Sequence, residues 1–208
     1  MDIITPGMVM IMSAIVAIRT ANKCLLFADK RKVVRVDEGY MLYDDAHKLF
    51  RPNKNLAVAV TGSFAKDEKF DAPFAEVDRL RLDVDSVCEQ IRQSWEKKLA
   101  TGERLQSRTY YAGGINRDGE IALKYISLDS SSWEIYTGSV SKDSDAILVS
   151  FPPGLENEKE ELMKEITSLL TTDNGESVRN KVFAFIQELS EKSKMVNAFV
   201  ESEEISKQ

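Results

Sequence analysis

The sequence predicts an α+β protein in which two stacked antiparallel sheets are flanked by helices, as a four-layer αββα sandwich. Short apolar runs open the chain and return in its middle, and each group is followed by segments with helical periodicity. Hairpins that alternate with paired helices in this way favour layered packing of helices on sheets. No Pro-, Gly- or Ser-rich linker divides the 208 residues, so we expect one domain over 13–208 and an N-terminal extension over 1–12.

The first predicted element is a β-hairpin. Residues 13–19 and 24–31 are rich in β-branched and large aliphatic side chains, and the polar residues 20–23 separate them. Residues 32–36 and 40–43 are short strand candidates. Residues 56–62 form a nearly continuous apolar run that is typical of a strand buried on both faces.

Helical periodicity begins after this buried run. Ser63 is a candidate cap for a helix from Phe64, although Pro73 interrupts the pattern. A clearer helix begins after Asp83 or Asp85 and ends at Gly102. Its apolar face is formed by residues at helical spacing, namely Val84, Val87, Cys88, Ile91, Trp95 and Leu99.

The middle of the chain returns to a period of two. Residues 107–115 and 120–127 are predicted strands joined by a turn at 116–119, and the Asp-Gly in that turn is a good hairpin signal. Residues 133–137 form a further strand candidate. Residues 146–151 fit either a strand or a short helix, and the prolines that follow end this segment.

Two helices are predicted near the C-terminus, separated by Asn174-Gly175. The apolar faces are Leu155, Leu162, Ile166 and Leu169 in the first, and Val178, Val182, Phe185, Ile186 and Leu189 in the second. The tail over 195–208 fits either a helix or a last strand at 196–200.

Composition excludes several function classes. The net charge of −6 argues against a broad nucleic-acid surface. One histidine and two cysteines outside any CxxC pair argue against a metal site or a disulfide framework, and the sequence holds no GxSxG, GxxxxGK, HExxH or GxGxxG motif. We therefore expect no metal and no cofactor, in a cytoplasmic protein.

The first twelve residues have three interpretations. The apolar run over 8–18 is too short to span a bilayer, and the segment before it lacks the basic start of a secretory signal. The segment is a disordered or peripheral tail, the product of a start codon upstream of Met8, Met10 or Met12, or a propeptide.

Several motifs together resemble the proteasome-type N-terminal-nucleophile hydrolases. Residues 13–18 (SAIVAI) resemble the mature amino terminus of this family, where threonine is usual, and 28–31 (ADKR) resembles its Asp-x-Arg element. Residues 47–50 (HKLF) and 55–63 (NLAVAVTGS) are similar to the segment with the catalytic lysine and the oxyanion glycine. The central hairpin and 138–141 (GSVS) extend the resemblance to about residue 141.

The resemblance implies a role for each matching residue. Ser13 would be the nucleophile, with its own free α-amino group as the base, and this amine titrates near pH 8 when unperturbed. Asp29 would pair with Lys48, and Lys48 would favour deprotonation of the Ser13 hydroxyl. The Gly62 N–H would face the oxyanion, where a donor contributes about 3 kcal/mol, and Ser139 would orient the amine.

Each of these residues also has an ordinary structural interpretation. Taken singly, Asp29 fits a turn cap or surface charge, Lys48 a solvated strand residue, and Ser139 a strand-end hydroxyl. Arg31 is expected to support a loop. His47 alternates in face with Lys48 and is expected at the surface.

The sequence departs from the family pattern at four places. Serine replaces threonine as the nucleophile, and Met12 stands where self-processing members usually have glycine. The family's later Asp-x-x-Ser-Gly-Gly element is not found, although Ser190 and Ser193 occur in that region without an aspartate. The segment between Asp29 and Lys48 is also a few residues longer than in the family.

Two function classes follow. The first is a peptidase that cleaves amide bonds of a peptide or protein substrate with Ser13. A small-amide acylase, which shares this nucleophile but not the ring assembly, is a further possibility. The second is a non-catalytic subunit of the same fold that acts in assembly or binding. By family analogy we expect a homo-oligomeric ring and an ATPase partner, and we expect neither nucleic-acid nor membrane binding. Residues 32–45 would border the site.

Overall fold

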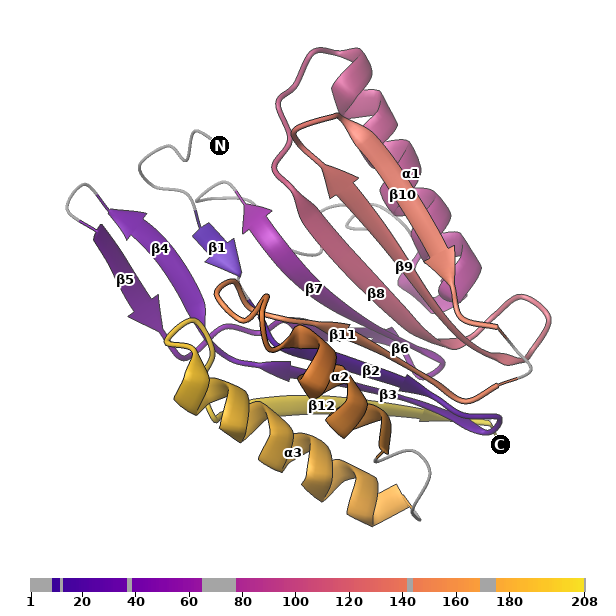
Figure 1. The fold of residues 1–208 in the computed structure, drawn as a ribbon. Helices are drawn as coiled ribbons and strands as arrows, with labels where there is room; N and C mark the ends of the chain where they lie inside the picture. Colours follow the sequence, from indigo (N-terminus) through magenta and orange to yellow (C-terminus); the bar gives the residue numbers. More distant parts are fainter. Residues whose placement is uncertain are drawn as a thin grey trace.

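The chain folds into four layers in the order helix, sheet, sheet, helices (Figure 1). The structure is a computed structural model, and it describes residues 9–11, 13–36, 39–64, 78–141, 144–168 and 175–207. Two antiparallel sheets stack face to face, which confirms the fold class that the sequence predicts. None of the described helices is long and apolar enough to cross a bilayer.

The larger sheet has eight strands. Seven follow the order β10-β9-β8-β7-β1-β4-β5, and β6 pairs separately with β7. The strands are β1 (Val9–Ile11), β4 (Lys32–Val36), β5 (Gly39–Tyr43), β6 (Leu49–Asn53), β7 (Leu56–Phe64), β8 (Arg108–Ile115), β9 (Ile121–Asp129) and β10 (Glu134–Ser139).

The smaller sheet has four strands in the order β11-β2-β3-β12. They are β2 (Ile15–Arg19), β3 (Lys23–Asp29), β11 (Ala146–Ser150) and β12 (Val200–Ser206). The predicted opening hairpin is confirmed as β2 and β3, with Ile15 opposite Ala28 and Arg19 opposite Cys24. Residues 146–150 form a strand, which settles the alternative left open by the sequence.

Helices cover the outer face of each sheet. The helix α1 (Val84–Ala100) lies on the larger sheet, and α2 (Lys159–Ser168) and α3 (Gly175–Lys192) lie on the smaller one (Figure 1). Asp83 caps α1, because its side chain accepts the Ser86 N–H while the Ser86 hydroxyl accepts the Asp83 N–H. This reciprocal pair satisfies two of the donors that a helix start leaves free.

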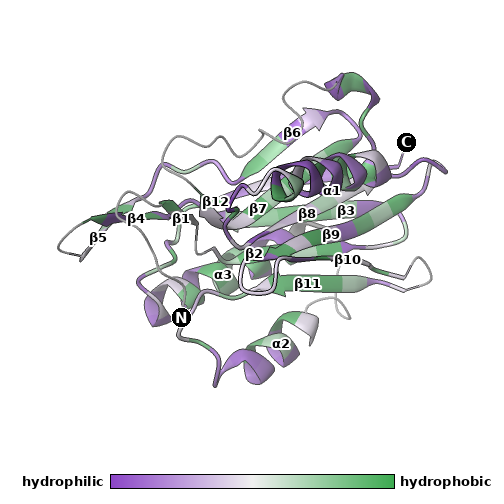
Figure 2. Ribbon diagram, turned by 90° about the horizontal axis from the view of Figure 1, so that it is seen from above, coloured by the Kyte–Doolittle hydropathy of each residue, from purple (hydrophilic) through white to green (hydrophobic). Residues whose placement is uncertain are grey.

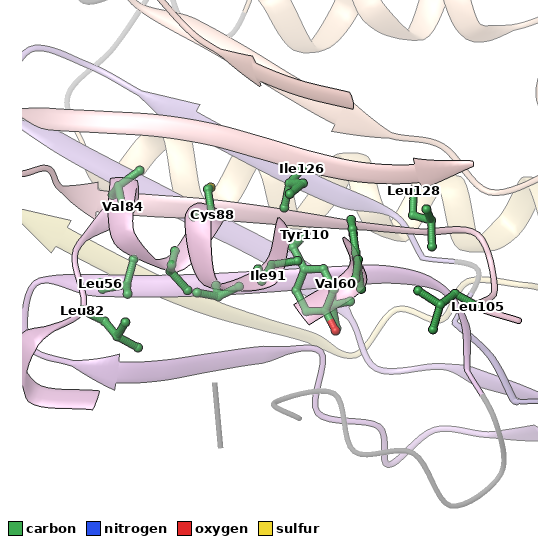
Figure 3. Packing of buried hydrophobic residues seen from close by; sticks show 14 of the residues in the cluster. Leu56, Val60, Leu82, Val84, Cys88, Ile91, Leu105, Tyr110, Ile126 and Leu128 are labelled. Atoms are coloured by element: carbon green, nitrogen blue, oxygen red, sulfur yellow. The ribbon is translucent and has the colours of Figure 1, made fainter. Parts of the chain in front are cut away.

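Three apolar clusters join the layers. The first fills the space between α1 and the larger sheet around Ile91 and Tyr110 (Figure 3), and the second fills the space between the smaller sheet and α2 and α3. The third, which includes Ile15, Leu26 and Ala59, lies between the two sheets. Figure 2 shows hydrophobic residues along the central strands, whereas hydrophilic residues are frequent on the helices.

Some boundaries differ from the sequence-based expectation. Ser63 and Phe64 extend β7 instead of starting a helix, and the rest of that predicted helix, with Pro73, lies outside the described residues. The last strand spans 200–206 instead of 196–200, and Leu169 lies beyond the described part of α2.

The described part of the N-terminal extension belongs to the larger sheet. Residues 9–11 form β1, which lies between β4 and β7 and is antiparallel to both. Val9 is opposite Val34 and Phe64, and Ile11 is opposite Gly62. Residues 9–11 are therefore not a peripheral tail, since they connect the β4–β5 hairpin to the rest of the sheet.

Candidate active site

Ser13 lies between the two sheets, just before β2. Its side chain is buried, with 1% of the residue exposed, and its Oγ has no hydrogen-bond partner among the described residues. Its N–H points to the Thr61 hydroxyl oxygen at 3.4 Å. A buried hydroxyl without a hydrogen-bond partner costs about 1–3 kcal/mol of folding free energy. The burial of the Ser13 hydroxyl therefore does not stabilise the fold.

The Asp29 carboxylate is the centre of the polar group beside Ser13. Its Oδ1 accepts the Lys48 ammonium at 2.9 Å and the Ala14 N–H at 3.0 Å. Its Oδ2 accepts the N–H groups of Arg31 at 3.0 Å and Asn197 at 3.4 Å. Four donors directed at one carboxyl group favour its ionised form.

Asp29 and Lys48 form a buried ion pair, since neither side chain is exposed. Burial raises the pKa of Asp29 and lowers the pKa of Lys48, while the attraction between the two opposes both shifts. Because four donors stabilise the Asp29 carboxylate, the shift that matters chemically is the lowered pKa of Lys48. The 2.9 Å contact with the Asp29 carboxylate opposes that shift and favours the charged ammonium.

A second carboxylate fixes the backbone at Lys48. Glu201 of β12 accepts the N–H groups of Lys48 and Leu49 on one oxygen, the latter at 2.8 Å. The other oxygen lies 3.3 Å from Nδ1 of His47, whose ring is largely exposed, as the alternation in face predicts. Glu201 thereby anchors the start of β6 to the smaller sheet.

Arg31 ties the turn after β3 to the C-terminal segment. Its guanidinium binds both oxygens of Asp44, at 2.6 and 2.9 Å, and donates to the carbonyl oxygens of Lys194 and Val196. The side-chain oxygen of Asn197 accepts the Lys30 N–H at 3.0 Å. Arg31 therefore supports a loop, as the sequence predicts.

Gly62 stands beside Thr61 in β7. Its φ of +124° is open to glycine almost alone, and an added Cβ would lie 2.4 Å from the Arg108 Cα and 2.5 Å from the Ser107 carbonyl oxygen. The larger sheet thus requires glycine here. Any oxyanion contact would come from this tightly held piece of backbone.

The structure does not bring Ser139 into this group. Ser139 pairs with Lys124 at the end of β10, where it lines a separate cavity of about 470 Å³ with Asp85 and Arg92. Three strand spacings separate β10 from β7, which is about 14 Å across the sheet. The Gly-Ser-x-Ser string at 138–141 is short, and strand ends commonly carry serine, so the role expected for Ser139 stays a prediction that this placement does not support.

Another serine, Ser150, lies on the strand that pairs with β2. It ends β11 and is paired with Ile15, two residues after Ser13. After Phe151 the chain continues with Pro152 and Pro153, which have no backbone N–H that could donate a hydrogen bond. Sequence reasoning therefore missed Thr61, Ser150, Asn197 and Glu201, of which only Thr61 has a local signal, because it precedes Gly62.

No described group of three or more His, Cys, Asp or Glu residues is arranged to hold a metal ion. Both cysteines are buried free thiols.

No family model and no curated protein sequence matches the chain. Among solved structures, the chain is similar to eukaryotic HslV from Trypanosoma brucei, with a TM-score of 0.58 and 13% sequence identity. The match covers 93% of this chain and 99% of that one. The likeness shows an HslV-like, proteasome-like fold over nearly the whole chain.

Proposed function

We propose that the protein is a proteasome-like N-terminal-nucleophile hydrolase that cleaves peptide bonds with Ser13 once residues 1–12 have been removed. The observation that carries the proposal is the buried, unpartnered Ser13 Oγ next to the Asp29–Lys48 pair. The backbone connects the two, since the N–H of Ala14, the residue after Ser13, donates to the same Asp29 oxygen that accepts the Lys48 ammonium.

The reaction uses the free amine of Ser13 as its base. The Oγ attacks the substrate carbonyl carbon while the hydroxyl proton moves to the α-amine. The tetrahedral intermediate then expels the leaving amine, which takes that proton, and an ester remains on Ser13. Water hydrolyses the ester and restores the hydroxyl. Lys48 supplies positive potential throughout, and the Gly62 N–H is the proposed oxyanion donor.

Thr61 takes the role that the sequence assigned to Ser139. Its hydroxyl oxygen is 3.4 Å from the Ser13 nitrogen, so after processing it can accept a proton of the α-amine and orient it. Ser150, which is opposite Ile15 on the neighbouring strand β11, is the second candidate for this contact with the α-amine.

The position of β1 supports a peptide substrate. Strands β4 and β7 pair with β1 on its two sides, so removal of residues 1–12 leaves two strand edges facing one another. An extended peptide can add to such edges through its backbone. Of the segment over 32–45, the described strand β4 forms one side of this groove.

The experiment compares the full chain with a chain that begins at Ser13. We expect the Ser13-terminated form to hydrolyse fluorogenic peptides and to be labelled by a hydroxyl-directed electrophile, and the full chain to do neither. Ser13→Thr should retain turnover and Ser13→Ala should abolish it. Intact mass shows whether the cell removes Met1 to Met12, by self-cleavage or by an aminopeptidase after initiation at Met12.

A non-catalytic subunit is the second candidate. The hydroxyls of Ser190 and Ser193 make local bonds, to the Gln187 carbonyl and from the Met195 N–H, and no aspartate accompanies them. A folded Ser13-terminated chain that is neither labelled nor active would favour this candidate. Under either function we propose a homo-oligomeric ring, a cytoplasmic location and, by analogy alone, an ATPase partner.

A further inference from the structure

The larger sheet ends in two free edges. Its strand order places β5 at one edge and β10 at the other (Figure 1). Among the described strands, none pairs with the outer side of either one. Each edge therefore presents backbone N–H and C=O groups that another strand can bind.

The β5 edge is apolar on both faces. The exposed fractions of Tyr40, Met41, Leu42 and Tyr43 are 53%, 48%, 44% and 37%. The strand Gly39–Tyr43 holds no charged residue and no proline. Monomeric proteins usually protect an edge with charges, proline or a bulge, and β5 has no such charge or proline.

The β10 edge carries two exposed aromatic residues. Trp133, in the turn before β10, is 42% exposed, and Tyr136 is 49% exposed. Trp133 is also the one non-glycine residue with positive φ in the described chain, at +59°. A left-handed conformation costs a non-glycine residue about 1–2 kcal/mol. Because the Trp133 ring is exposed, packing within its own chain offsets little of this cost.

We propose that the β5 edge of one copy packs against the Trp133–Tyr136 edge of a second copy. The two patches lie on different surfaces, so the contact is heterologous, and each copy can make it twice. Such contacts close into a ring or continue as a filament. The contact does not depend on the chemistry at Ser13, and it assigns surfaces to the ring proposed above.

Area supports a contact between copies. At about half exposure, the six side chains present roughly 600 Å² of mostly apolar surface, taking about 200 Å² for each. Stable interfaces bury about 1,200–2,000 Å² in total, so these side chains supply up to half, and backbone edges and flanking residues supply the rest. A symmetric β5–β5 contact would leave Trp133 and Tyr136 exposed.

Two double variants test the proposal. The first, Tyr40→Thr with Leu42→Lys, alters only the β5 edge. The second, Trp133→Gly with Tyr136→Thr, alters only the β10 edge and removes the positive-φ tryptophan. We expect the full-length wild type to sediment as an oligomer at micromolar concentration and each variant to sediment as a monomer. The control Leu80→Thr, at an exposed residue outside both edges, should stay oligomeric.

Mixing the two variants gives the decisive result. One intact contact remains in the mixture, between the β5 edge of the second variant and the β10 edge of the first, so we expect a heterodimer and nothing larger. A monomeric wild type or a mixture that stays monomeric would overturn the proposal. So would a β10 variant that keeps its oligomeric state, because that outcome indicates a β5–β5 contact.

A wild-type measurement guards against variants that fail to fold. Hydrogen exchange of the full chain is followed on dilution through the dissociation range. We expect segments 39–43 and 133–139 to lose protection together, while α1 keeps its own. Loss of protection at only one of the two segments contradicts the heterologous contact.

Discussion

At the scale of single residues, the strongest stability prediction concerns the Asp29–Lys48 pair. Lys48→Met leaves a buried carboxylate without its cation, and breaking such a pair typically costs about 3–5 kcal/mol. Asp29→Asn in the same chain should restore part of that loss. The measurement is urea unfolding of the single and double variants.

The matched control for this pair is the exposed pair Lys164–Glu160 on α2. Lys164→Met should change the free energy of unfolding by no more than the roughly 0.5 kcal/mol typical of helix surface pairs. Equal losses at Lys48 and Lys164 would show that Lys48 is solvated, which is its ordinary interpretation from sequence.

The buried Cys24 thiol should make the free energy of unfolding fall at alkaline pH. Burial raises its pKa from 9.0 to about 12. The folded chain therefore holds a proton that the unfolded chain releases above pH 9, and the stabilisation is lost as the pH rises toward 12. The slope is about 1.4 kcal/mol per pH unit for one group.

Comparison of wild type with Cys24→Ala isolates this effect. Below pH 8 their free energies of unfolding should differ by a constant, which reflects packing. Between pH 9 and 12 the difference should shrink, because only the wild type has a thiol at position 24 that releases its proton on unfolding. A constant difference over the whole range would contradict the assigned pKa.

The site residues that could be predicted from sequence are close together along the chain. Ser13, Asp29, Lys48 and Gly62 fall within 50 positions, and the strand pattern between them fixes their order. Glu201 and Asn197 bond to this group from about 150–170 residues away. No local sequence pattern predicts these long-range hydrogen bonds, because they depend on how β12 lies along β3.

At the scale of elements, β7 depends on Gly62. Gly62→Ala combines an unfavourable φ with a Cβ about 2.4 Å from the Arg108 backbone. We expect a loss of stability well above the roughly 1–2 kcal/mol of a left-handed conformation alone. Gly102→Ala is the control, because its φ is +76° and nothing lies within 4 Å of the new Cβ. Thermal unfolding of both variants measures the difference, and equal losses would contradict the clash.

The role of β1 is tested by hydrogen exchange. In a chain that begins at Ser13, we expect faster exchange over 32–36 and 61–64, whose strands lose a neighbour. The β2–β3 hairpin should be unaffected, because β1 does not pair with it. A synthetic peptide with the sequence of residues 1–12 should restore protection. Unchanged exchange would mean that β1 does not occupy this groove in solution.

The strands that sequence reasoning misplaced are those with little apolar pattern. Strand β12 reads Val-Glu-Ser-Glu-Glu-Ile-Ser, with two apolar residues, yet it pairs with β3 along its full length. It lies at an edge of the smaller sheet, where only partial burial is needed. Ser63 and Phe64 looked like a helix start, but pairing with β1 keeps them extended.

At the scale of the whole molecule, the apolar layer between the sheets should make the two outer layers unfold together. Trp95 reports on the α1 layer, and Phe185 belongs to α3 on the opposite outer face. Phe185→Ala removes a side chain that is 2% exposed, which should cost about 3–5 kcal/mol. If the layers are coupled, the blue-shifted emission of Trp95 should be lost at the same lower urea concentration as the circular dichroism signal.

The control for this coupling is Phe183→Ala on the same helix. Phe183 is 37% exposed, and its ring lies 5.8 Å from that of Phe27, so Phe183→Ala should cost less stability than Phe185→Ala and should shift both signals equally. A Trp95 transition that stays in place while the circular dichroism transition moves would mean that the α3 layer unfolds by itself. Coincident transitions would mean that Ser13 and Asp29, which sit between the sheets, are held by the cooperative unit as a whole.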